Sequence, residues 1–366
     1  MSEGPKQGST ERVPAAKRGR WWLPWAAWLV AVLALATVNS SRRILIGRME
    51  LPSAQIFAMS LGALLGLTLV MAWLWLGWRV GARRLGIELA PSSLDRRPVR
   101  FVLVGLLGLV LSSWVYARFI EPRWVVVQSV PLGLVPIPGV SPEPVRLVVL
   151  SDLHVDSDRE PWLSLPAKVN ALEPDLIVLL GDLLSSPTAL PVLRRTLSEL
   201  RASTAKLAVR GNWEVWYWSQ LPLLEDTGFQ WLDRELETVE IRSQTVHVLG
   251  WDYRDDDDGR LAEQRLAELP VPDWRIFAYH TPDLIPEVPS ADLALAGHTH
   301  GGQVALPGYG AFVTLSKYGK RFERGAVRVG DTWAYVNPGI GVEPAIPLRF
   351  LVRPEITLVE LGTKQR

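Results

Sequence analysis

Four of the five histidines in this 366-residue chain follow short apolar runs and stand close to carboxylate or amide side chains. Imidazole with carboxylate, in a chain that has no cysteine, is a ligand set that favours Zn, Mn, Fe or Ni over Mg or Ca. Seven such ligands are too many for one tetrahedral ion, but they suit two ions about 3.5–4 Å apart that share one carboxylate. The pattern therefore predicts a site for two divalent metal ions, and its candidate ligands are Asp152, His154, Asp182, Asn212, His280, His298 and His300.

The elements that must position these side chains are strands of an α/β domain. From about residue 145, short apolar runs alternate with segments of helical period at 158–172, 187–203 and 260–269. Open α/β sheets bind ligands beyond the carboxyl ends of their strands, and each of five runs ends in candidate ligands. Alternate residues of a strand point to opposite sides, so we expect a glycine-flanked turn to bring both His298 and His300 into the site. The fifth histidine, His247, lies inside a run and is expected to be structural.

The order of these motifs resembles that of the calcineurin-like metallophosphoesterase superfamily. D-x-H, G-D, G-N, a single histidine and G-H-x-H follow one another within 145–362, and the tail segments SKYGKRFERG, VNPGIG and PEITLVEL resemble its membrane-associated bacterial branch. The resemblance implies a four-layer α/β/β/α sandwich. It also implies that one metal is held by Asp152, His154 and His300, that the other is held by Asn212, His280 and His298, and that Asp182 bridges the two.

The segment Gly-Asn-Trp-Glu at 211–214 departs from the family pattern, which usually has histidine where Trp213 stands. The resemblance implies that this histidine protonates the leaving oxygen or stabilises its charge, whereas indole offers only a neutral N–H. A general acid is worth roughly 10²–10⁴-fold. It matters little when the leaving group is a phosphate with a pKa of about 6. We therefore expect a phosphoanhydride or an aryl-type phosphodiester substrate. The resemblance adds a candidate of the UDP-2,3-diacylglucosamine type, because the superfamily's diphosphatases for that lipid similarly lack this histidine, although an outward-facing site argues against a cytoplasmic nucleotide-linked substrate.

Three stretches near the N-terminus, at 21–41, 56–78 and 101–117, contain no charged residue. A membrane-spanning helix needs roughly 17–25 apolar residues, so three transmembrane helices are predicted within 21–117, after a disordered basic arm at 1–20. A linker and first strand at 118–144 then lead to the phosphoesterase domain at 145–362. The arm and the second loop carry eleven Lys and Arg against five on the other side. This bias predicts a multi-pass cell-membrane protein whose catalytic domain is extracytoplasmic.

Composition excludes several classes of protein. The net charge of +1 gives no global basic footprint, so no nucleic-acid partner is expected. The absence of cysteine excludes disulfides and thiolate catalysis. Arg210 and Arg349 are candidates for contacting a phosphate, although arginine near a sheet edge is more often part of a surface ion pair. The sequence does not indicate the oligomeric state.

The sequence thus predicts a membrane-anchored dimetal phosphohydrolase in which a metal-bridging hydroxide attacks a phosphodiester or phosphoanhydride. Asp182, Asn212 and His280 are the expected catalytic residues, and the substrate is expected to be lipid-linked or another envelope component. One alternative is a metal-binding sensor with little catalysis, because Trp213 replaces the family histidine. Another is a channel or transporter with an appended domain, although the predicted spans contain no charge that would mark a transport pathway.

Overall fold

The computed structural model describes residues 77–82, 84–87, 97–132, 143–254, 259–344 and 346–362. The predicted basic arm, the predicted span at 21–41 and nearly all of that at 56–78 lie outside the described residues. The third predicted span falls on α3 (Arg97–Val115), which runs into a π-helical turn (Tyr116–Ile120) and a 3-10 turn (Glu121–Arg123).

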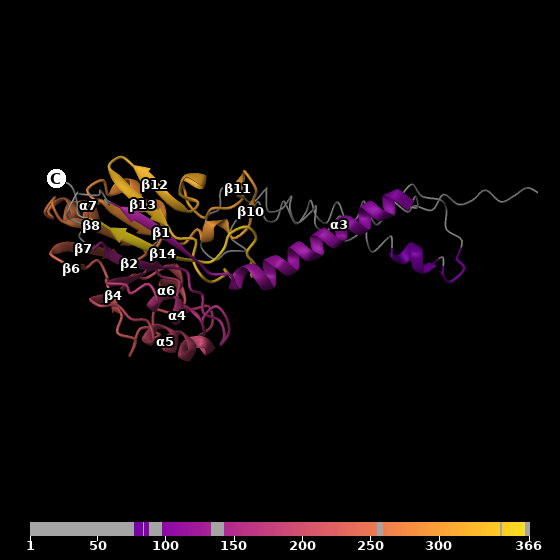
Figure 1. Ribbon diagram of the computed structural model, residues 1–366, viewed down its shortest axis with the longest axis horizontal. Coiled ribbons are helices and arrows are strands. Elements are labelled where there is room, and N and C mark those ends of the chain that lie inside the picture. The colour runs from indigo at the N-terminus through magenta and orange to yellow at the C-terminus, as the bar shows by residue number, and fades with distance from the viewer. Residues whose placement is uncertain are drawn as a thin grey trace, which may run out of the picture. The chain divides into compact units, whose positions relative to one another are not determined.

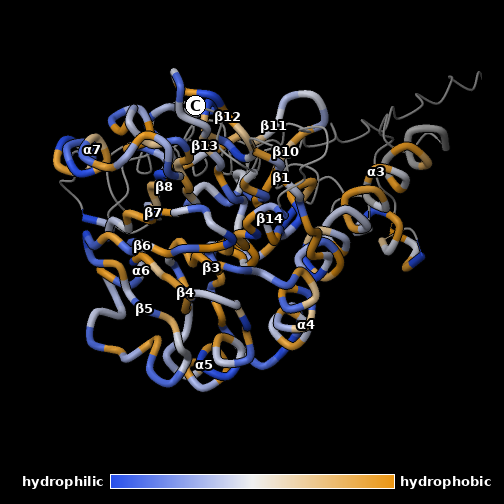
Figure 2. Tube along the Cα trace, turned by 60° about the vertical axis from the view of Figure 1, so that its left-hand side comes forward, coloured by the Kyte–Doolittle hydropathy of each residue, from blue (hydrophilic) through white to orange (hydrophobic). Residues whose placement is uncertain are grey.

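Among the described residues, one helical stretch, Val104–Arg123, is long and apolar enough to cross a membrane. Most of its side chains are exposed rather than packed on the domain. Hydrophobic residues lie along the length of α3 (Figure 2). A surface of this kind is unfavourable in water, and it therefore suggests membrane association.

Two six-stranded sheets form the centre of the molecule (Figure 1). In the first, β2 to β5 are parallel, whereas β14 runs antiparallel to β2 and parallel to β1. Its order is β1 (Val126–Leu132), β14 (Glu355–Leu361), β2 (Val145–Leu150), β3 (Leu176–Leu179), β4 (Ala205–Ala208), β5 (Gln230–Trp231). In the second, β7, β8, β9 and β13 are parallel and the two edge strands are antiparallel to their neighbours. Its order is β12 (Gly325–Val329), β13 (Thr332–Val336), β9 (Leu293–Ala296), β8 (Trp274–Tyr279), β7 (Gln244–Trp251), β6 (Leu236–Ile241).

The apolar residues of the sheets fill three separate layers of core. Val149, Val178 and Val248 belong to the layer between the two sheets. On the outer face of the first sheet, Val148 and Ile177 pack with residues of α4 (Leu165–Asn170) and α5 (Leu190–Ser198). On the outer face of the second sheet, a third cluster includes α7 (Arg260–Ala267) and the 3-10 turn Pro282–Glu287. The arrangement is α/β/β/α, and the central strands read as continuous apolar runs because both of their faces are buried.

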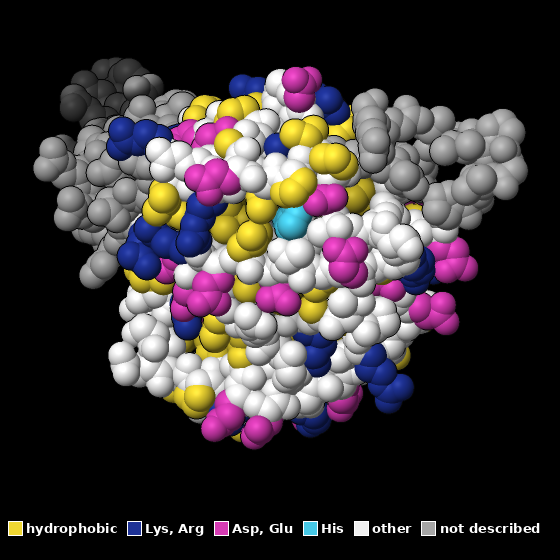
Figure 3. All heavy atoms as spheres, turned by 90° about the vertical axis from the view of Figure 1, so that its left-hand side faces the viewer, with side chains coloured by type: hydrophobic (Ala, Val, Ile, Leu, Met, Phe, Trp, Pro, Cys, Tyr) yellow, Lys and Arg dark blue, Asp and Glu magenta, His cyan; other side chains and the backbone are white. Residues whose placement is uncertain are grey.

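The remaining elements are short. They are α6 (Asn212–Trp216), the hairpin of β10 (Ala305–Leu306) and β11 (Gly310–Ala311), and 3-10 turns at Pro187–Ala189, His300–Gly302 and Gly319–Phe322. The predicted helices at 158–172 and 187–203 are longer than the observed α4 and α5, since Pro166 and Pro191 stand in the first turns of these helices, where proline is favoured. His247 lies within β7, as expected. On the face shown in Figure 3, basic and acidic side chains are interspersed.

The end of the apolar helix is fixed to the α/β domain. Glu121 is fully buried, and its carboxylate accepts the backbone N–H of Leu351 at 2.7 Å. The carbonyl oxygen of Ala117 accepts the backbone N–H of Arg349 at 2.9 Å, and the ring of Tyr116 packs edge-on against Phe350. The chain then enters β1, which pairs with β14 along its whole length.

Candidate metal centre

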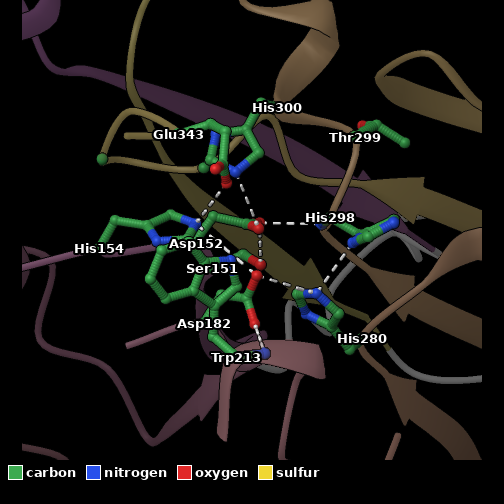
Figure 4. A network of polar contacts seen from close by, with 12 residues as sticks. Ser151, Asp152, His154, Asp182, Trp213, His280, His298, Thr299, His300 and Glu343 are labelled. Atoms are coloured by element: carbon green, nitrogen blue, oxygen red, sulfur yellow. Dashed lines mark hydrogen bonds and ion pairs between the residues drawn. The ribbon is translucent and has the colours of Figure 1, made fainter. Parts of the chain in front are cut away.

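The structure brings all seven candidate ligands together at the carboxyl ends of the strands. Figure 4 labels six of them, and Asn212 contacts His280. Asp152 and His154 directly follow β2, and Asp182 follows β3. Asn212 begins α6 shortly after β4. His280 follows β8, and His298 and His300 follow β9, so that each sheet contributes to the site.

The backbone at these strand ends is strained. Five of the seven residues are non-glycine residues with positive φ, a conformation that costs about 1–3 kcal/mol each and is typical of functional sites. They are Asp152 (49°), His154 (47°), Asp182 (55°), His298 (69°) and His300 (50°). The expected turn after β9 is therefore made by the two histidines themselves together with Gly301 and Gly302, which also have positive φ.

Two glycines allow the strand ends to approach one another. A Cβ at Gly297 would collide with Ser151 and Asp152. A Cβ at Gly211 would collide with the Asp182 carboxylate and the His280 ring. Both positions therefore need glycine because other groups of the site occupy the space.

Asp152, His154 and His300 form the first cluster of possible metal ligands. Their nearest ligand atoms all lie within 4.8 Å of one another, and all three residues are buried. His300 Nε2 lies 3.3 Å from Asp152 Oδ1. His154 Nδ1 lies 3.1 Å from the hydroxyl of Ser185, which leaves His154 Nε2 directed toward the centre of the site.

Asp182, His280 and His298 form the second cluster, which meets the same 4.8 Å criterion. His298 Nδ1 lies 3.1 Å and Asn212 Oδ1 lies 2.9 Å from His280 Nε2. His280 Nδ1 lies 2.6 Å from the carbonyl oxygen of Leu180. A carbonyl oxygen only accepts, so Nδ1 carries the proton and Nε2 of His280 is the atom left for a metal.

Asp182 lies between the two clusters. Its Oδ2 is 3.4 Å from His280 Nε2 and 3.6 Å from His154 Nε2, whereas its Oδ1 accepts the backbone N–H of Trp213 at 2.9 Å. One oxygen of this carboxylate, which belongs to the second cluster, thus also faces a ligand nitrogen of the first cluster.

The polar atoms of the first cluster fit a metal ion. Asp152 Oδ1 and His154 Nε2 are buried and have no hydrogen-bond partner among the described residues. Buried polar atoms without a partner are rare, because they lose hydration without compensation. The other oxygen of Asp152 accepts the hydroxyl of Ser151 at 2.5 Å and the N–H of His298 at 2.9 Å, which holds the carboxylate with Oδ1 free.

Burial and neighbouring charges determine the protonation states of these side chains. Burial lowers the pKa of His154 to about 4 and that of His298 to about 3, so both imidazoles are neutral, as metal ligands must be. Burial raises the pKa of Asp152 and Asp182, but the nearby histidines outweigh it and hold both carboxyl pKa values below their usual range. Burial also lowers the pKa of His280, yet the Asp182 carboxylate outweighs it and raises that pKa to about 9.

The pKa of His280 predicts that metal affinity rises with pH. Below pH 9 the metal-free protein keeps a second ring proton on His280, at Nε2, which a metal must displace. The apparent affinity of the second cluster for Mn²⁺ should therefore rise by up to about tenfold per pH unit toward pH 9 and then level off. Calorimetric titration with Mn²⁺ at several pH values measures this change. An affinity that stays constant between pH 6.5 and pH 8.5 would contradict the assignment of His280.

Glu214 supports the site without joining it. The side chain is buried, and its carboxylate accepts the backbone N–H groups of Asp182, Leu183 and Gly211, each at 2.8 Å. These bonds join the turn after β3 to the turn after β4. Burial, followed by the charge of Asp182, raises the pKa of Glu214 to about 7.

Glu343 is a site residue that the sequence motifs do not reveal. Its Oε2 lies 3.9 Å from His154 Nε2, and its backbone N–H donates to the side-chain oxygen of Gln303. Gly341, two residues earlier, is the available sequence signal for a close approach of this loop to the site. A Cβ at Gly341 would collide with the backbone of Leu153 and Asp152. The loop after β13 thus adds a carboxylate to the first cluster (Figure 4).

Aromatic side chains flank the first cluster. The half-buried Trp213 ring packs edge-on against His154, with ring centroids 5.0 Å apart. Within the aromatic run 215–218, Trp218 donates to the carbonyl oxygen of Leu184 at 2.7 Å and packs on the core, whereas Tyr217 is exposed.

The two arginines considered from the sequence have different environments. Arg210 forms an ion pair with Asp233 and lies over the ring of Trp231. Arg349 is neither a phosphate contact nor part of a surface ion pair, so both interpretations of this residue are wrong. It is fully buried and donates to the carbonyl oxygens of Gly341 and Pro338, because it crosses beneath the loop that carries Glu343.

Comparison with known proteins identifies the family. Residues 145–302 match the calcineurin-like phosphoesterase family. The uncharacterized metallophosphoesterase YkuE of Bacillus subtilis is 31% identical over 272 residues, covering 67% of this chain and 88% of that protein. This chain belongs to the calcineurin-like metallophosphoesterase family. It is a metal-dependent phosphoesterase, and it has two His/Asp clusters that could hold metal ions.

Two further relatives of this metallophosphoesterase bear on its context. The phosphodiesterase YaeI of Escherichia coli is 27% identical over 265 residues, covering 68% of this chain and 93% of that protein. The transmembrane protein with metallophosphoesterase domain of Bos taurus is 29% identical over 316 residues, covering 77% of this chain and 66% of that protein. The match thus spans about two thirds of the length of this transmembrane relative.

Proposed function

We propose that this metallophosphoesterase is a membrane-anchored two-metal hydrolase that cleaves phosphodiesters or phosphoanhydrides with good leaving groups. The observation that carries the proposal is the position of Asp182 Oδ2, which faces a ligand nitrogen of both clusters. In the proposed assignment, Asp152, His154 and His300 would hold one ion, Asn212, His280 and His298 would hold the other, and the Asp182 carboxylate would be shared by both. Zn, Mn, Fe and Ni all suit this ligand set.

Divalent ions bound at such a site supply Lewis acidity and a water molecule activated near neutral pH. The residues of this chain provide the arrangement. Asp182 places negative charge between the two clusters, and the Leu180 carbonyl fixes the ring of His280. Glu214 holds the turns that carry Asp182 and Asn212 at a fixed separation.

Trp213 directs the choice of substrate. It flanks the first cluster, where a phosphoryl leaving group would lie, and it provides no acidic proton. Substrates whose leaving group departs without a proton should therefore be favoured, such as aryl diesters and pyrophosphates. A nucleotide-linked diacyl sugar of the UDP-2,3-diacylglucosamine type, or another lipid-linked envelope substrate, meets this condition. The similarity to YaeI, which is named a phosphodiesterase, supports the diester class.

The membrane part of the proposal is a multi-pass region at 21–117 that anchors a catalytic domain at 145–362. It is supported by the apolar helix Val104–Arg123 and by the name of the bovine relative. The bias of Lys and Arg favours an extracytoplasmic catalytic domain. That orientation argues against a cytoplasmic nucleotide-linked substrate and favours another lipid-linked envelope substrate.

A comparison of leaving groups tests the proposed substrate class. We expect the purified protein to hydrolyse bis(p-nitrophenyl) phosphate and a UDP-sugar at least about 10²-fold faster than glycerol phosphate, since only the last needs a general acid. The measurement is kcat/KM with excess Mn²⁺. Faster turnover of glycerol phosphate would overturn the substrate class while leaving the hydrolase intact.

The second candidate is a metal-dependent sensor with little catalysis, and Trp213 is the observation that favours it. Full metal occupancy without turnover of bis(p-nitrophenyl) phosphate would support the sensor.

A further inference from the structure

A pocket lies between the end of the apolar helix and the metal centre. Arg118, Pro122 and Arg123 line it from the helix end, and Ile340 to Val342 line it from the loop after β13. The loop after β2 contributes residues 159–162 and His154. His154 belongs both to this lining and to the first cluster, so the pocket adjoins the candidate metal site.

The charges in this pocket favour an anion. The lining holds three arginines against two carboxylates, Asp156 and Glu160. Arg159 is paired with Asp156 at 2.5 Å, and Glu160 accepts the hydroxyl of Ser164. In the described part of the chain, no carboxylate lies within ion-pair distance of Arg118 or Arg123. Arg118 lies over the ring of Phe119, and Arg123 donates to the Phe119 carbonyl oxygen, so neither positive charge is offset by a carboxylate. Guanidinium is well suited to phosphate oxygens.

These arginines are held at a fixed place relative to the metal centre. The Glu121 carboxylate accepts the N–H of Leu351, and the Ala117 carbonyl accepts that of Arg349. These bonds hold the helix end against residues 349–351, which closely follow the pocket residue Pro347 in the chain. Half-buried Arg118 lies directly next to Ala117 within this fixed turn. The pocket is therefore a built feature of the fold rather than a gap between loose segments.

The surroundings of the pocket place it beside a membrane. Arginines at the end of an apolar helix extend their charged groups to the interface between membrane and water. Trp114 and Trp124, which flank this helix end, are 51% and 48% exposed, as expected of interfacial tryptophans. A soluble phosphate would offer the same oxygens to Arg118, but only a lipid would also place an apolar part along α3.

We propose that this pocket binds the anionic, phosphate-containing headgroup of a membrane lipid and presents it to the metal centre. The inference rests on the proposed hydrolase function and deepens it, since it names the residues that select a phosphate-containing lipid headgroup. Phosphatidylglycerol has alkyl leaving groups that need a general acid, so it serves below as a binding probe and not as the preferred substrate. Arg118 is the principal determinant of specificity, and Arg123 adds positive charge at the entrance.

Lipid retention by the full-length protein tests this inference. The protein is placed in nanodiscs of equal parts phosphatidylglycerol and phosphatidylcholine, and the lipids that it retains are identified by native mass spectrometry. We expect wild type to retain phosphatidylglycerol about tenfold over phosphatidylcholine, the preference that one charged hydrogen-bonded pair provides. Arg118→Gln should retain both lipids about equally, and Arg118→Lys should keep part of the preference. The matched control is Arg328→Gln, which removes an exposed arginine outside the pocket and should behave as wild type.

The alternatives give different results. An undiminished preference in Arg118→Gln, or an equal loss in Arg328→Gln, would overturn the inference. Displacement of the retained lipid by inorganic phosphate at millimolar concentration would point to a site for soluble phosphate, and it would also overturn it. Lipid retention does not require turnover, so selective retention without hydrolysis of bis(p-nitrophenyl) phosphate would leave the headgroup site standing while the hydrolase proposal fails.

Discussion

Asp182→Asn should reduce kcat for bis(p-nitrophenyl) phosphate by about 10²–10⁴-fold, because the charge stabilisation that a metal provides is worth several kcal/mol and each 1.4 kcal/mol is tenfold in rate. Asp182 Oδ2 is the atom that faces both clusters, so the amide removes the negative charge shared between two ions. The variant should also bind fewer metal ions, and the measurements are kcat and metal content by mass spectrometry.

Asp175→Asn is the matched control for this variant. Asp175 is also buried and precedes the same strand, β3, but its carboxylate pairs with Arg242 away from the metal centre. This control should lower the stability of the fold and leave kcat per folded molecule unchanged. If Asp182→Asn kept two ions and lost less than about tenfold in kcat, an effect of no more than 1.4 kcal/mol, Asp182 would not be a bridging ligand.

Trp213→His should accelerate the hydrolysis of glycerol phosphate by about 10²-fold or more, because a positioned general acid is worth roughly 10²–10⁴-fold. Hydrolysis of bis(p-nitrophenyl) phosphate should change little, since nitrophenolate leaves without a proton. The ring at this position packs against His154, so an imidazole would lie beside the first cluster. The measurement is kcat/KM for both substrates as a function of pH.

Trp213→Phe separates the chemistry of this position from its packing. Phenylalanine keeps an aromatic ring beside His154 but offers no proton, so it should leave glycerol phosphate slow. Equal rates for the histidine and phenylalanine variants would mean that the space released by tryptophan, rather than acidity, controls the reaction. Thermal melting of both variants checks that each is folded.

Much of the site can be predicted from the sequence because strand ends carry it. Apolar runs of four to eight residues are recognisable, parallel strands align their carboxyl ends, and Asp152, Asp182 and His280 each follow such a run directly. The partition of the seven residues between two metals came from the family resemblance and not from spacing. The structure groups Asp152, His154 and His300 on one side, and Asp182, His280 and His298 on the other.

The features that the sequence did not predict depend on tertiary contacts. Positive φ at His298 and His300 is not a preference of histidine and is imposed by the surrounding site. Glu343 reaches His154 only because Gln303 and the buried Arg349 hold its loop. Glu214 follows Asn212 by two residues and looks like a further ligand, yet three backbone N–H groups take up its carboxylate.

The central claim is a pair of metal ions joined by Asp182, and the metal content of the purified full-length protein, measured together with hydrolysis of bis(p-nitrophenyl) phosphate, tests it most directly. We expect about two divalent ions per chain in wild type. We also expect fewer ions in His298→Ala, with turnover lost on chelation and restored by Mn²⁺. A chain that binds no metal, or one that hydrolyses the diester equally well after chelation, would contradict the account.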